Sequence, residues 1–481
     1  MKDFRPILLV NGILLATLGA LMLIPAFADL FYYNPDWVVF AASGLITVFV
    51  GVLMWAGSRG QEIRLTTRHG FLMTTLAWIL LPAFGAVPFI WSQPGFSVTD
   101  AYFEAVSGIT TTGATVFTGL DTMPPGILTW RAVLQWLGGL GIIVMSIAVL
   151  PMLQVGGMQL FKAEAFDTAD KILPRASQIA AWLVGMYLIL TLACALSYHL
   201  AGMRLFYALL HSMSTVATGG FSPHDASIGY YQSAEIETIC IVFMILGSLP
   251  FLLYVDALRR GPQRLFRDAQ VRTFIAMVLV FTVVIWLERV EEGAAPLFTF
   301  RETMFNFVSV MTGTGFATTD FNQWGGLSMI VIFTAMCLGG CAGSTSCGIK
   351  TFRFMVLWED IKQHLVSVVS PSRIHVKRYN GRPLGDDVSA AVQSFFFLYV
   401  ASILVLAALL GMAGLEPLTA LSGAATAISN VGPGLGEEIG PAGNFAGLPG
   451  IAKWLLVGGM ILGRLELFSV LVLFLPRFWR G

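Results

Sequence analysis

Four short turns rich in glycine and threonine recur along the 481-residue chain, each set between apolar stretches. The turns read Thr110-Thr111-Thr112-Gly113-Ala114, Ala217-Thr218-Gly219-Gly220-Phe221, Thr312-Gly313-Thr314-Gly315-Phe316 and Val431-Gly432-Pro433-Gly434-Leu435. Glycine lets a backbone turn its carbonyl groups inward, including conformations with positive φ. Rings of such carbonyl oxygens can replace the hydration shell of a permeating cation. These residue types therefore predict that backbone oxygens coordinate a monovalent cation.

The composition places these turns in a membrane protein. Hydrophobic residues make up 56% of the chain and charged residues only 12%, with a mean hydropathy of +0.77. Soluble domains carry roughly 25% charged residues, and a spanning helix needs about 20 mostly apolar residues. Ten stretches meet that need: 7–28, 37–57, 70–92, 126–154, 176–201, 235–258, 271–288, 326–357, 390–413 and 451–475.

Lys and Arg concentrate in alternate connections between these spans. The basic connections lie around 59–68, 162–175, 259–272 and 353–382 and at both ends, and the acidic ones around 29–36, 100–121, 225–237, 320 and 416–438. Because basic residues mark the cytoplasmic side, we expect both termini in the cytoplasm and the four turns facing outside. The run 7–28 resembles a signal peptide in charge and length, but it can span the bilayer and is interpreted as a retained helix.

Each of the four turns has the same neighbours, namely a span, a short helical segment before the turn and a second span after it. The last glycines of successive turns are 107, 95 and 119 residues apart, and an internal repeat indicates similar structural units. The short segments, 99–109, 203–214, 300–311 and 417–429, would point partially negative C-terminal ends at the ion. Acidic residues outside would add a cation-attracting field.

The predicted fold is therefore an all-α polytopic membrane protein. Four pseudo-repeats of span, re-entrant pore loop and span would surround one central pore, with two extra N-terminal transmembrane helices. The expected divisions are 1–68 for the two N-terminal helices, then 69–165, 166–265, 266–370 (which contains an interrupted span) and 371–481 for the four repeats.

The span near 326–357 is interrupted by glycine, serine and threonine between Gly339 and Lys350. Each interior glycine costs a helix about 1 kcal/mol, and freed backbone groups in lipid need partners. We expect a flexible loop, the alternative being a glycine-rich packing surface. Arg464 lies inside the last span, where an arginine costs roughly 2.5 to 3.5 kcal/mol and faces an interior or a cavity, or pairs with Glu466 or another carboxylate. Lys350 could snorkel to the cytoplasm.

No motif indicates an enzyme. The five cysteines are odd in number and lie in apolar or Gly/Ser surroundings, so they are read as reduced. His211 and His224 flank the second turn, where a structural role is expected over proton coupling, and no nucleophile elbow, Walker A or His-Glu-x-x-His pattern occurs. Nothing predicts a nucleic-acid partner or a nucleotide-binding domain. The basic stretches 259–272 and 373–382 are solvated loops that could contact anionic membrane lipid or a cytoplasmic partner.

The chain resembles, over essentially its whole length, the membrane subunit of the Trk/Ktr potassium uptake systems, and is most similar to the TrkH-like branch. The resemblance rests on six stretches: 107–115 (SGITTTGAT), 211–222 (HSMSTVATGGFS), 311–316 (MTGTGF), 430–436 (NVGPGLG), 339–350 (GGCAGSTSCGIK) and 463–466 (GRLE). It implies one filter glycine per repeat, mapped to Gly113, Gly220, Gly315 and Gly434. In relatives, serine at the first of these goes with Na⁺ permeability, so Gly113 favours K⁺.

The resemblance also implies site residues. The selectivity filter would comprise Thr111, Thr112, Gly113, Thr218, Gly219, Gly220, Thr314, Gly315, Gly432, Pro433 and Gly434. K⁺ would bind at Thr111, Thr112, Val216, Ala217, Thr218, Gly219, Gly313, Thr314, Val431 and Gly432. The gate would comprise Gly339, Gly340, Cys341, Ala342, Gly343, Ser344, Thr345, Ser346, Cys347, Gly348, Lys350 and Arg464, the last a positive barrier beneath the filter.

The predicted function is potassium uptake across the bacterial inner membrane through a K⁺-selective, channel-like pore, with K⁺ as the transported ion and no covalently bound cofactor. By resemblance, the intramembrane loop and a cytoplasmic TrkA-type subunit binding NAD(H), ATP or ADP would gate the pore, and the chain would form a homodimer. The alternative is a cation-coupled K⁺ symporter, using H⁺ or Na⁺, with alternating access. Four equivalent turns favour a continuous pore, since rocking transporters usually show two related halves.

Overall fold

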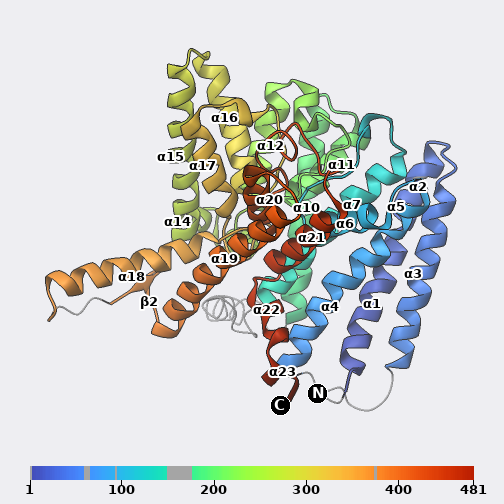
Figure 1. The fold of residues 1–481 in the computed structure, drawn as a ribbon, viewed down its shortest axis with the longest axis horizontal. Helices are drawn as coiled ribbons and strands as arrows, with labels where there is room; N and C mark the ends of the chain where they lie inside the picture. The colour runs from blue at the N-terminus through green and yellow to red at the C-terminus, as the bar shows by residue number, and fades with distance from the viewer. Residues whose placement is uncertain (1–2, 59–65, 93–94, 149–175, 373–375, 481) are drawn as a thin grey trace.

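The computed structural model describes residues 3–58, 66–92, 95–148, 176–372 and 376–480. Within these ranges the protein is a bundle of helices, and both ends of the chain lie at the same end of it (Figure 1). A small antiparallel hairpin joins β1 (Arg378–Tyr379) to β2 (Arg382–Pro383). The predicted boundary between repeats at 165/166 and the basic cluster at 162–175 lie outside the described residues.

Seven spans in the described ranges are long and apolar enough to cross a membrane, each as one helix or as two consecutive helices. They are α1–α2 (Arg5–Leu21, Leu23–Phe31), α3 (Trp37–Gly57), α4–α5 (Thr67–Gly85, Val87–Ser92), α7 (Pro125–Ala148), α10 (Ala176–Leu200), α15 (Ala269–Glu291) and α19 (Asp386–Met412). They match seven of the ten predicted stretches to within a few residues, although 149–154 lies outside the described residues.

The other three predicted stretches are broken. α12 (Ala234–Gly247) and α13 (Phe251–Arg260) meet at 92°, and α21 (Gly450–Arg464) meets α22 (Phe468–Leu471) and η4 (Val472–Phe474) at 106°. α17 (Gly326–Cys337) and α18 (Thr351–Val369) are separated by the segment 338–350. The prediction of an interruption in 326–357 is confirmed, but that of continuous helices over 235–258 and 451–475 was wrong.

The two unforeseen breaks have local causes. Pro250 precedes α13 as its N-cap residue, and a proline in a helix interior removes a hydrogen bond and clashes with the preceding turn. In the last span, Glu466 and Leu467 have positive φ values of 58° and 55°, a conformation that non-glycine residues adopt at a cost of about 1–3 kcal/mol. Each bend turns its helix sharply, and each lies close to the segment 338–350.

Four half-helices end at the four glycine-bearing turns. They are α6 (Val98–Ile109), α11 (Leu205–Val216), α16 (Pro296–Met311) and α20 (Pro417–Ser429), and they confirm the short helices predicted from sequence. Each packs against the helices that flank it in the chain, such as α10 and α12 around α11. Their C-terminal halves are buried, so the turns that follow begin in the interior of the bundle.

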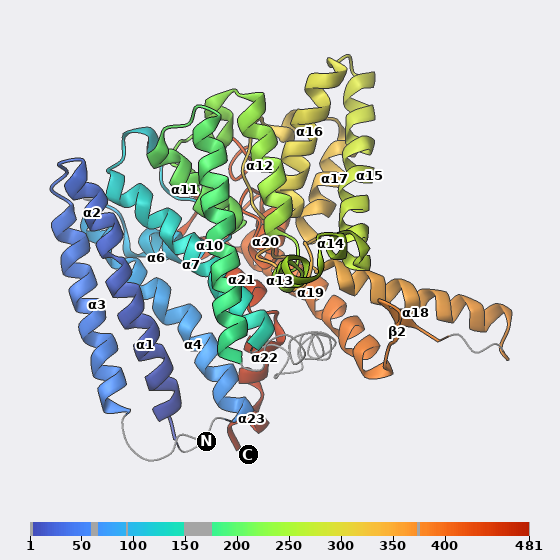
Figure 2. The ribbon, with the colours of Figure 1, turned by 180° about the vertical axis from the view of Figure 1, so that it is seen from behind.

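Two apolar clusters hold these half-helices. One includes Phe103 of α6 and Ile428 of α20, and the other includes Val216 of α11 and Val308 of α16. The first and fourth half-helices therefore contribute to one cluster and the second and third to the other, while Leu210 of α11 also belongs to the first cluster. The remaining short helices are α14 (Gln263–Arg267), α23 (Pro476–Arg480), η1 (Leu120–Thr122), η2 (Ser227–Tyr231) and η3 (Phe321–Gln323). Figure 2 shows α18 projecting sideways from the bundle.

Candidate functional site

The four turns share one backbone conformation. We number them turn 1 (110–114), turn 2 (217–221), turn 3 (312–316) and turn 4 (429–433). In each, two positions separated by one residue have positive φ: Thr111 and Gly113 (52°, 82°), Thr218 and Gly220 (49°, 81°), Gly313 and Gly315 (73°, 81°), and Asn430 and Gly432 (53°, 111°). The residue between them donates its backbone N–H to the half-helix carbonyl five residues earlier, at 2.9–3.1 Å in all four turns.

The turns also touch one another in chain order. A Cβ atom added to Gly113 would lie 2.2 Å from the carbonyl oxygen of Gly219, and one added to Gly220 would lie 1.9 Å from that of Thr314. The series continues from Gly315 to the Val431 oxygen at 2.1 Å, and closes from Gly432 to the Thr112 oxygen at 2.8 Å. Turns 1 to 4 therefore form a closed ring in which each glycine lies against a carbonyl oxygen of the next turn.

This ring corrects the register predicted for the fourth turn. Gly432, and not Gly434, has the positive φ and the ring contact of Gly113, Gly220 and Gly315. Gly432 and Pro433 also line the outer cavity described below, which Gly434 does not. The sequence comparison aligned the last glycine of each turn, but Pro433 follows the equivalent glycine as Ala114 and the two phenylalanines do in the other turns. The predicted alignment was therefore two residues out.

One cavity covers one face of the ring, which we call the outer face after the sidedness predicted from the charges. It is lined by Gly113, Gly220, Gly315 and Gly432 together with residues that follow them in the chain, and it encloses about 550 Å³ including its opening to solvent. The lining continues through Ser222, His224 and Asp225 to 439–445. All four equivalent glycines thus meet at a single hollow, which is the arrangement required of a shared ion pathway.

The segment 338–350 lies against the opposite face of the ring, where it touches residues that precede the glycines. The Ser346 hydroxyl donates to the Thr312 carbonyl oxygen at 2.6 Å, and the Thr345 hydroxyl lies 3.0 Å from the carbonyl oxygen of Val216. The sulfur of Cys347 lies 3.7 Å from the hydroxyl oxygen of Thr111. One segment therefore contacts turns 1 and 3 and the end of the half-helix that leads into turn 2.

The broken span 234–260 anchors this segment. The carbonyl oxygen of Gly247 accepts from the Thr345 backbone at 3.2 Å, and that of Ser248 accepts from the Cys341 backbone at 2.9 Å. Phe251 donates its backbone N–H to Gly343 at 2.9 Å. Since backbone groups freed inside a membrane must find partners within the protein, the break between α12 and α13 and the loop in the third unit satisfy each other.

Arg464 completes the contact with this segment. Its guanidinium contacts the Cys347 sulfur and donates to the carbonyl oxygen of Gly138 at 2.9 Å, and it lies 5.5 Å from the centre of the Trp78 ring. The Arg464 side chain is buried. Glu466 is not its partner, because Glu466 pairs with Arg353 of α18. Lys350 is buried and donates to the Ser346 carbonyl oxygen, so the alternative of a snorkelling Lys350 was wrong.

The Arg353–Glu466 pair gives a stability prediction. Arg353 is fully buried, with its guanidinium 3.6 Å from the centre of the Phe395 ring. Removing one partner of a buried ion pair costs about 3–5 kcal/mol, because a charge is left in the interior without its counterion. A Glu466→Gln protein should unfold at a distinctly lower temperature in detergent, and Glu437→Gln, at an exposed carboxylate, should not. Equal melting temperatures would contradict the importance of the pair.

Comparison with known proteins identifies the family of the chain. A family model described as TrkH, cation transport protein, matches residues 37–480. The chain belongs to the TrkH cation transport family. It is 42% identical to the Trk system potassium uptake protein TrkI of Halomonas elongata and 38% identical to TrkH of Escherichia coli K12, over 98–100% of each chain. It also matches the crystal structure of the potassium transporter TrkH from Vibrio parahaemolyticus, with a TM-score of 0.92, 37% identity and full coverage of both chains.

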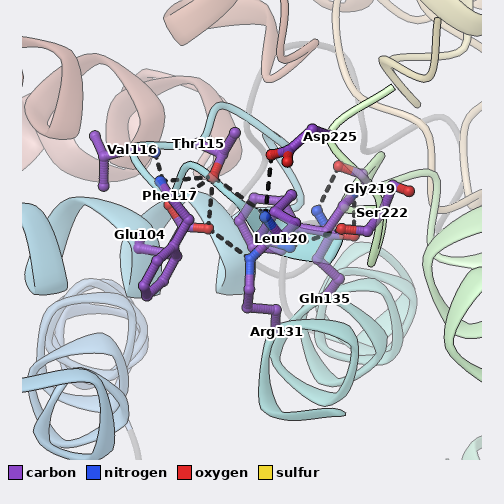
Figure 3. Close-up of polar contacts among 11 residues, drawn as sticks. Glu104, Thr115, Val116, Phe117, Leu120, Arg131, Gln135, Gly219, Ser222 and Asp225 are labelled. Carbon is purple, nitrogen blue, oxygen red and sulfur yellow. Dashed lines mark hydrogen bonds and ion pairs between the residues drawn. The ribbon is translucent and has the colours of Figure 1, made fainter. Parts of the chain in front are cut away.

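This TrkH-family chain carries a polar network on the outer side of turns 1 and 2 that the sequence reasoning missed (Figure 3). Arg131 of α7 donates to Glu104 at 2.8 Å, to the Thr115 hydroxyl at 3.1 Å and to the Ser222 carbonyl oxygen at 2.7 Å. Gln135, one helical turn later, donates to the Gly219 carbonyl oxygen and accepts from the Phe221 backbone at 2.9 Å. The sequence did contain a signal for this network, namely an arginine and a glutamine inside an apolar span.

The outer acidic residues do not all supply the field that was expected of them. Glu104 is fully buried against Arg131, and Asp100 pairs with Lys453 of α21 at 2.5 Å. Asp121 pairs with His224 at 2.5 Å. Partial burial raises the pKa of Asp121, but its hydrogen bonds from His224 and the Asp225 backbone outweigh this and hold the pKa below its usual value. Glu437 and Glu438 remain exposed.

Three of the K⁺ ligands predicted by resemblance have carbonyl oxygens with hydrogen-bond partners in this conformation. The Val216 carbonyl oxygen accepts from Thr345, that of Ala217 from the Thr218 hydroxyl, and that of Gly219 from Gln135. Among the described residues, the carbonyl oxygens of Thr112 and Thr314 accept no hydrogen bond. Thr111, Gly113, Gly220, Gly315 and Gly432 all lie in the ring, whereas Gly434 lies beyond it. Their roles as ion ligands remain predictions.

Proposed function

We propose that this protein takes up K⁺ across the bacterial inner membrane through one K⁺-selective, channel-like pore. The observation that carries the proposal is the closed ring of turns 1 to 4, in which four positive-φ glycines meet the carbonyl oxygens of their neighbours around one outer cavity. Carbonyl oxygens replace the hydration shell of a cation in such a ring. We choose K⁺ as the ion because the relatives are named as potassium uptake proteins.

In this proposal, each ring turn belongs to one pseudo-repeat, and the four repeats, 69–165, 166–265, 266–370 and 371–481, surround the pore after two N-terminal helices. Both termini are cytoplasmic, which the clustering of Lys and Arg supports and which agrees with their position at one end of the bundle (Figure 1). The half-helices end at the ring, so their partially negative C-terminal ends favour a cation there.

The segment 338–350 acts as the gate in this proposal. Its contacts with Thr111, Val216 and Thr312 support a position that blocks the inner face of the ring, and Arg464 adds a positive charge beside Cys347. By family resemblance, we extend the proposal to a homodimer and to control by a cytoplasmic TrkA-type subunit that binds NAD(H), ATP or ADP.

The test is ion flux from purified protein in liposomes, combined with recording in planar bilayers. We expect flux that is faster for K⁺ than for Na⁺ at equal gradients, together with unitary currents. Equal K⁺ and Na⁺ permeation would contradict the selectivity. Electrically silent flux, or flux in strict stoichiometry with H⁺ or Na⁺, would replace the pore by an alternating-access symporter.

Arg464 gives a prediction about the gate. Arg464→Ala removes the buried positive charge and its contacts with Cys347 and the Gly138 carbonyl oxygen, so K⁺ flux should rise. The matched control is Arg477→Ala in α23, outside this contact. An Arg464→Ala protein with the K⁺ flux of the unaltered chain would remove the barrier role.

A further inference from the structure

The four half-helices share a second equivalent position, nine residues before the ring glycine. It is held by Glu104 (113 − 9), His211 (220 − 9) and Asn306 (315 − 9) in the first three units, and these side chains are fully buried. They differ in charge and shape. What they share is a polar group on the face of the half-helix that contacts the residues following the ring glycine. We call these following residues the rising chain.

In each of these units the side chain bonds to the rising chain two or three residues after the ring glycine. Glu104 accepts from the Val116 backbone at 2.9 Å and from the Thr115 hydroxyl at 3.0 Å. The His211 Nε2 atom lies 3.2 Å from the Ser222 hydroxyl oxygen. Asn306 accepts from the Thr318 backbone at 3.2 Å and donates to the Thr318 hydroxyl at 2.8 Å.

The fourth unit makes the same contact from the adjacent residue. Gly423 (432 − 9) holds the equivalent position, and the buried Ser422 beside it bonds to Leu435, three residues after Gly432. The Ser422 hydroxyl accepts from the Leu435 backbone N–H at 2.9 Å and lies 3.2 Å from its carbonyl oxygen. We call Glu104, His211, Asn306 and Ser422 the clasp residues.

Arg131 joins two of the clasps. It donates to Glu104 and to Thr115 in the first unit, and to the carbonyl oxygen of Ser222 in the second, where Ser222 is also the partner of His211. Figure 3 shows Glu104, Thr115 and Ser222 converging on Arg131. The clasps therefore fix each rising chain to its own half-helix, and Arg131 fixes two rising chains to each other.

We propose that the clasp residues set the spacing of the ring, and through it the discrimination between K⁺ and Na⁺, without touching the ion. The proposal rests on the ion pathway proposed above. None of the four clasp residues lines the outer cavity, so they are positioning residues. A ring glycine lies between two fixed points: the half-helix bond just before it and the clasp just after it. Loss of the clasp removes the fixed point after the glycine, so the glycine and its carbonyl contact can shift.

The experiment measures reversal potentials in planar bilayers with K⁺ on one side and Na⁺ on the other. Asn306→Leu keeps the volume of the side chain and removes both bonds to Thr318. We expect the K⁺/Na⁺ permeability ratio to fall about tenfold, the factor for one buried hydrogen-bonded contact, with cation flux retained. The conservative Asn306→Asp still offers two acceptors to the backbone N–H and the hydroxyl, and should recover part of the ratio.

The matched control is Thr299→Val on the same half-helix. Thr299 is also buried, and its hydroxyl bonds only to the Ala295 carbonyl oxygen of its own helix, so the ratio should stay at that of the unaltered protein. Ser422→Ala is a second test in another unit. It is a smaller change, so it serves where Asn306→Leu does not fold. It too should lower the ratio.

The outcomes separate this inference from the proposed function. Unaltered protein that favours K⁺, with clasp variants that are less selective than Thr299→Val, supports the inference. If the unaltered protein favours K⁺ and both clasp variants keep its ratio, the inference is overturned while the pore stands. An unaltered protein without discrimination overturns the pore and the inference together.

Discussion

A Gly220→Ala protein is expected to lose its preference for K⁺ over Na⁺ almost completely. The new methyl carbon would lie 1.9 Å from the carbonyl oxygen of Thr314, and Gly220 has a φ of 81°. A non-glycine residue is strained there by about 1–3 kcal/mol, and the neighbouring contact is backbone, which cannot rotate away. The ring must therefore open between turns 2 and 3. The measurement is the K⁺/Na⁺ permeability ratio from reversal potentials, which should approach one.

The fourth turn supplies the matched control for this prediction. The methyl carbon of Gly434→Ala would meet only side chains, those of Ile439 and Ser422, in a backbone conformation open to other residues. That of Gly432→Ala would meet the backbone carbonyl oxygen of Thr112 at 2.8 Å, at a φ of 111°. Gly434→Ala should lower the permeability ratio less than Gly432→Ala does, because it leaves the backbone contacts of the ring in place. The reverse order would restore Gly434 as the ring glycine and contradict the register seen here.

Deletion of Ser344–Cys347 is expected to raise K⁺ flux strongly in the absence of any partner protein. The deletion removes Thr345, Ser346 and Cys347, whose side chains contact Val216, Thr312 and Thr111 at the inner face of the ring. It also removes the partner that holds Arg464 in place. Flux of K⁺ or Rb⁺ into liposomes measures the effect, which should appear as faster uptake at an unchanged K⁺/Na⁺ ratio.

Smaller changes guard against misfolding of the deletion. Thr345→Val with Ser346→Ala removes the hydroxyl contacts with the ring and the half-helix end but keeps the length of the loop, and should raise flux partially. Ser344→Ala is the control, because its hydroxyl donates to Cys341 within the loop itself. A deletion variant that stays closed, or that matches the unaltered protein in flux and regulation, would show that this segment is not the gate.

Much of the fold follows from local sequence. Apolar length predicts all seven of the spans that are not sharply bent, and the four half-helices can be predicted because each is too short to cross and is followed by a glycine-bearing turn. The interruption at 338–350 is visible because several glycines and hydroxyl residues fall within one span. The breaks at Pro250 and Glu466 are harder to see, since their neighbours remain apolar and hydropathy does not register a single bend.

The site was predicted less completely. Glycine marks where a ring contact is possible, but only the positions of neighbouring turns decide between Gly432 and Gly434. The partner of Glu466 proved to be Arg353 rather than the nearby Arg464, because the bend turns the two side chains toward different helices. The clasp residues share neither charge nor size, so that only their contacts with the rising chain make them recognisable as equivalent.

Locating the ion tests the ring most directly. Crystals of the protein soaked in Rb⁺, measured by anomalous scattering, should show a peak on the axis enclosed by the carbonyl oxygens of Thr112, Gly219, Thr314 and Val431. A peak there, displaced by K⁺ and not by an equal concentration of Na⁺, is the expected result. Rb⁺ bound instead at a site within one unit, with no density between the four turns, would contradict a shared pore.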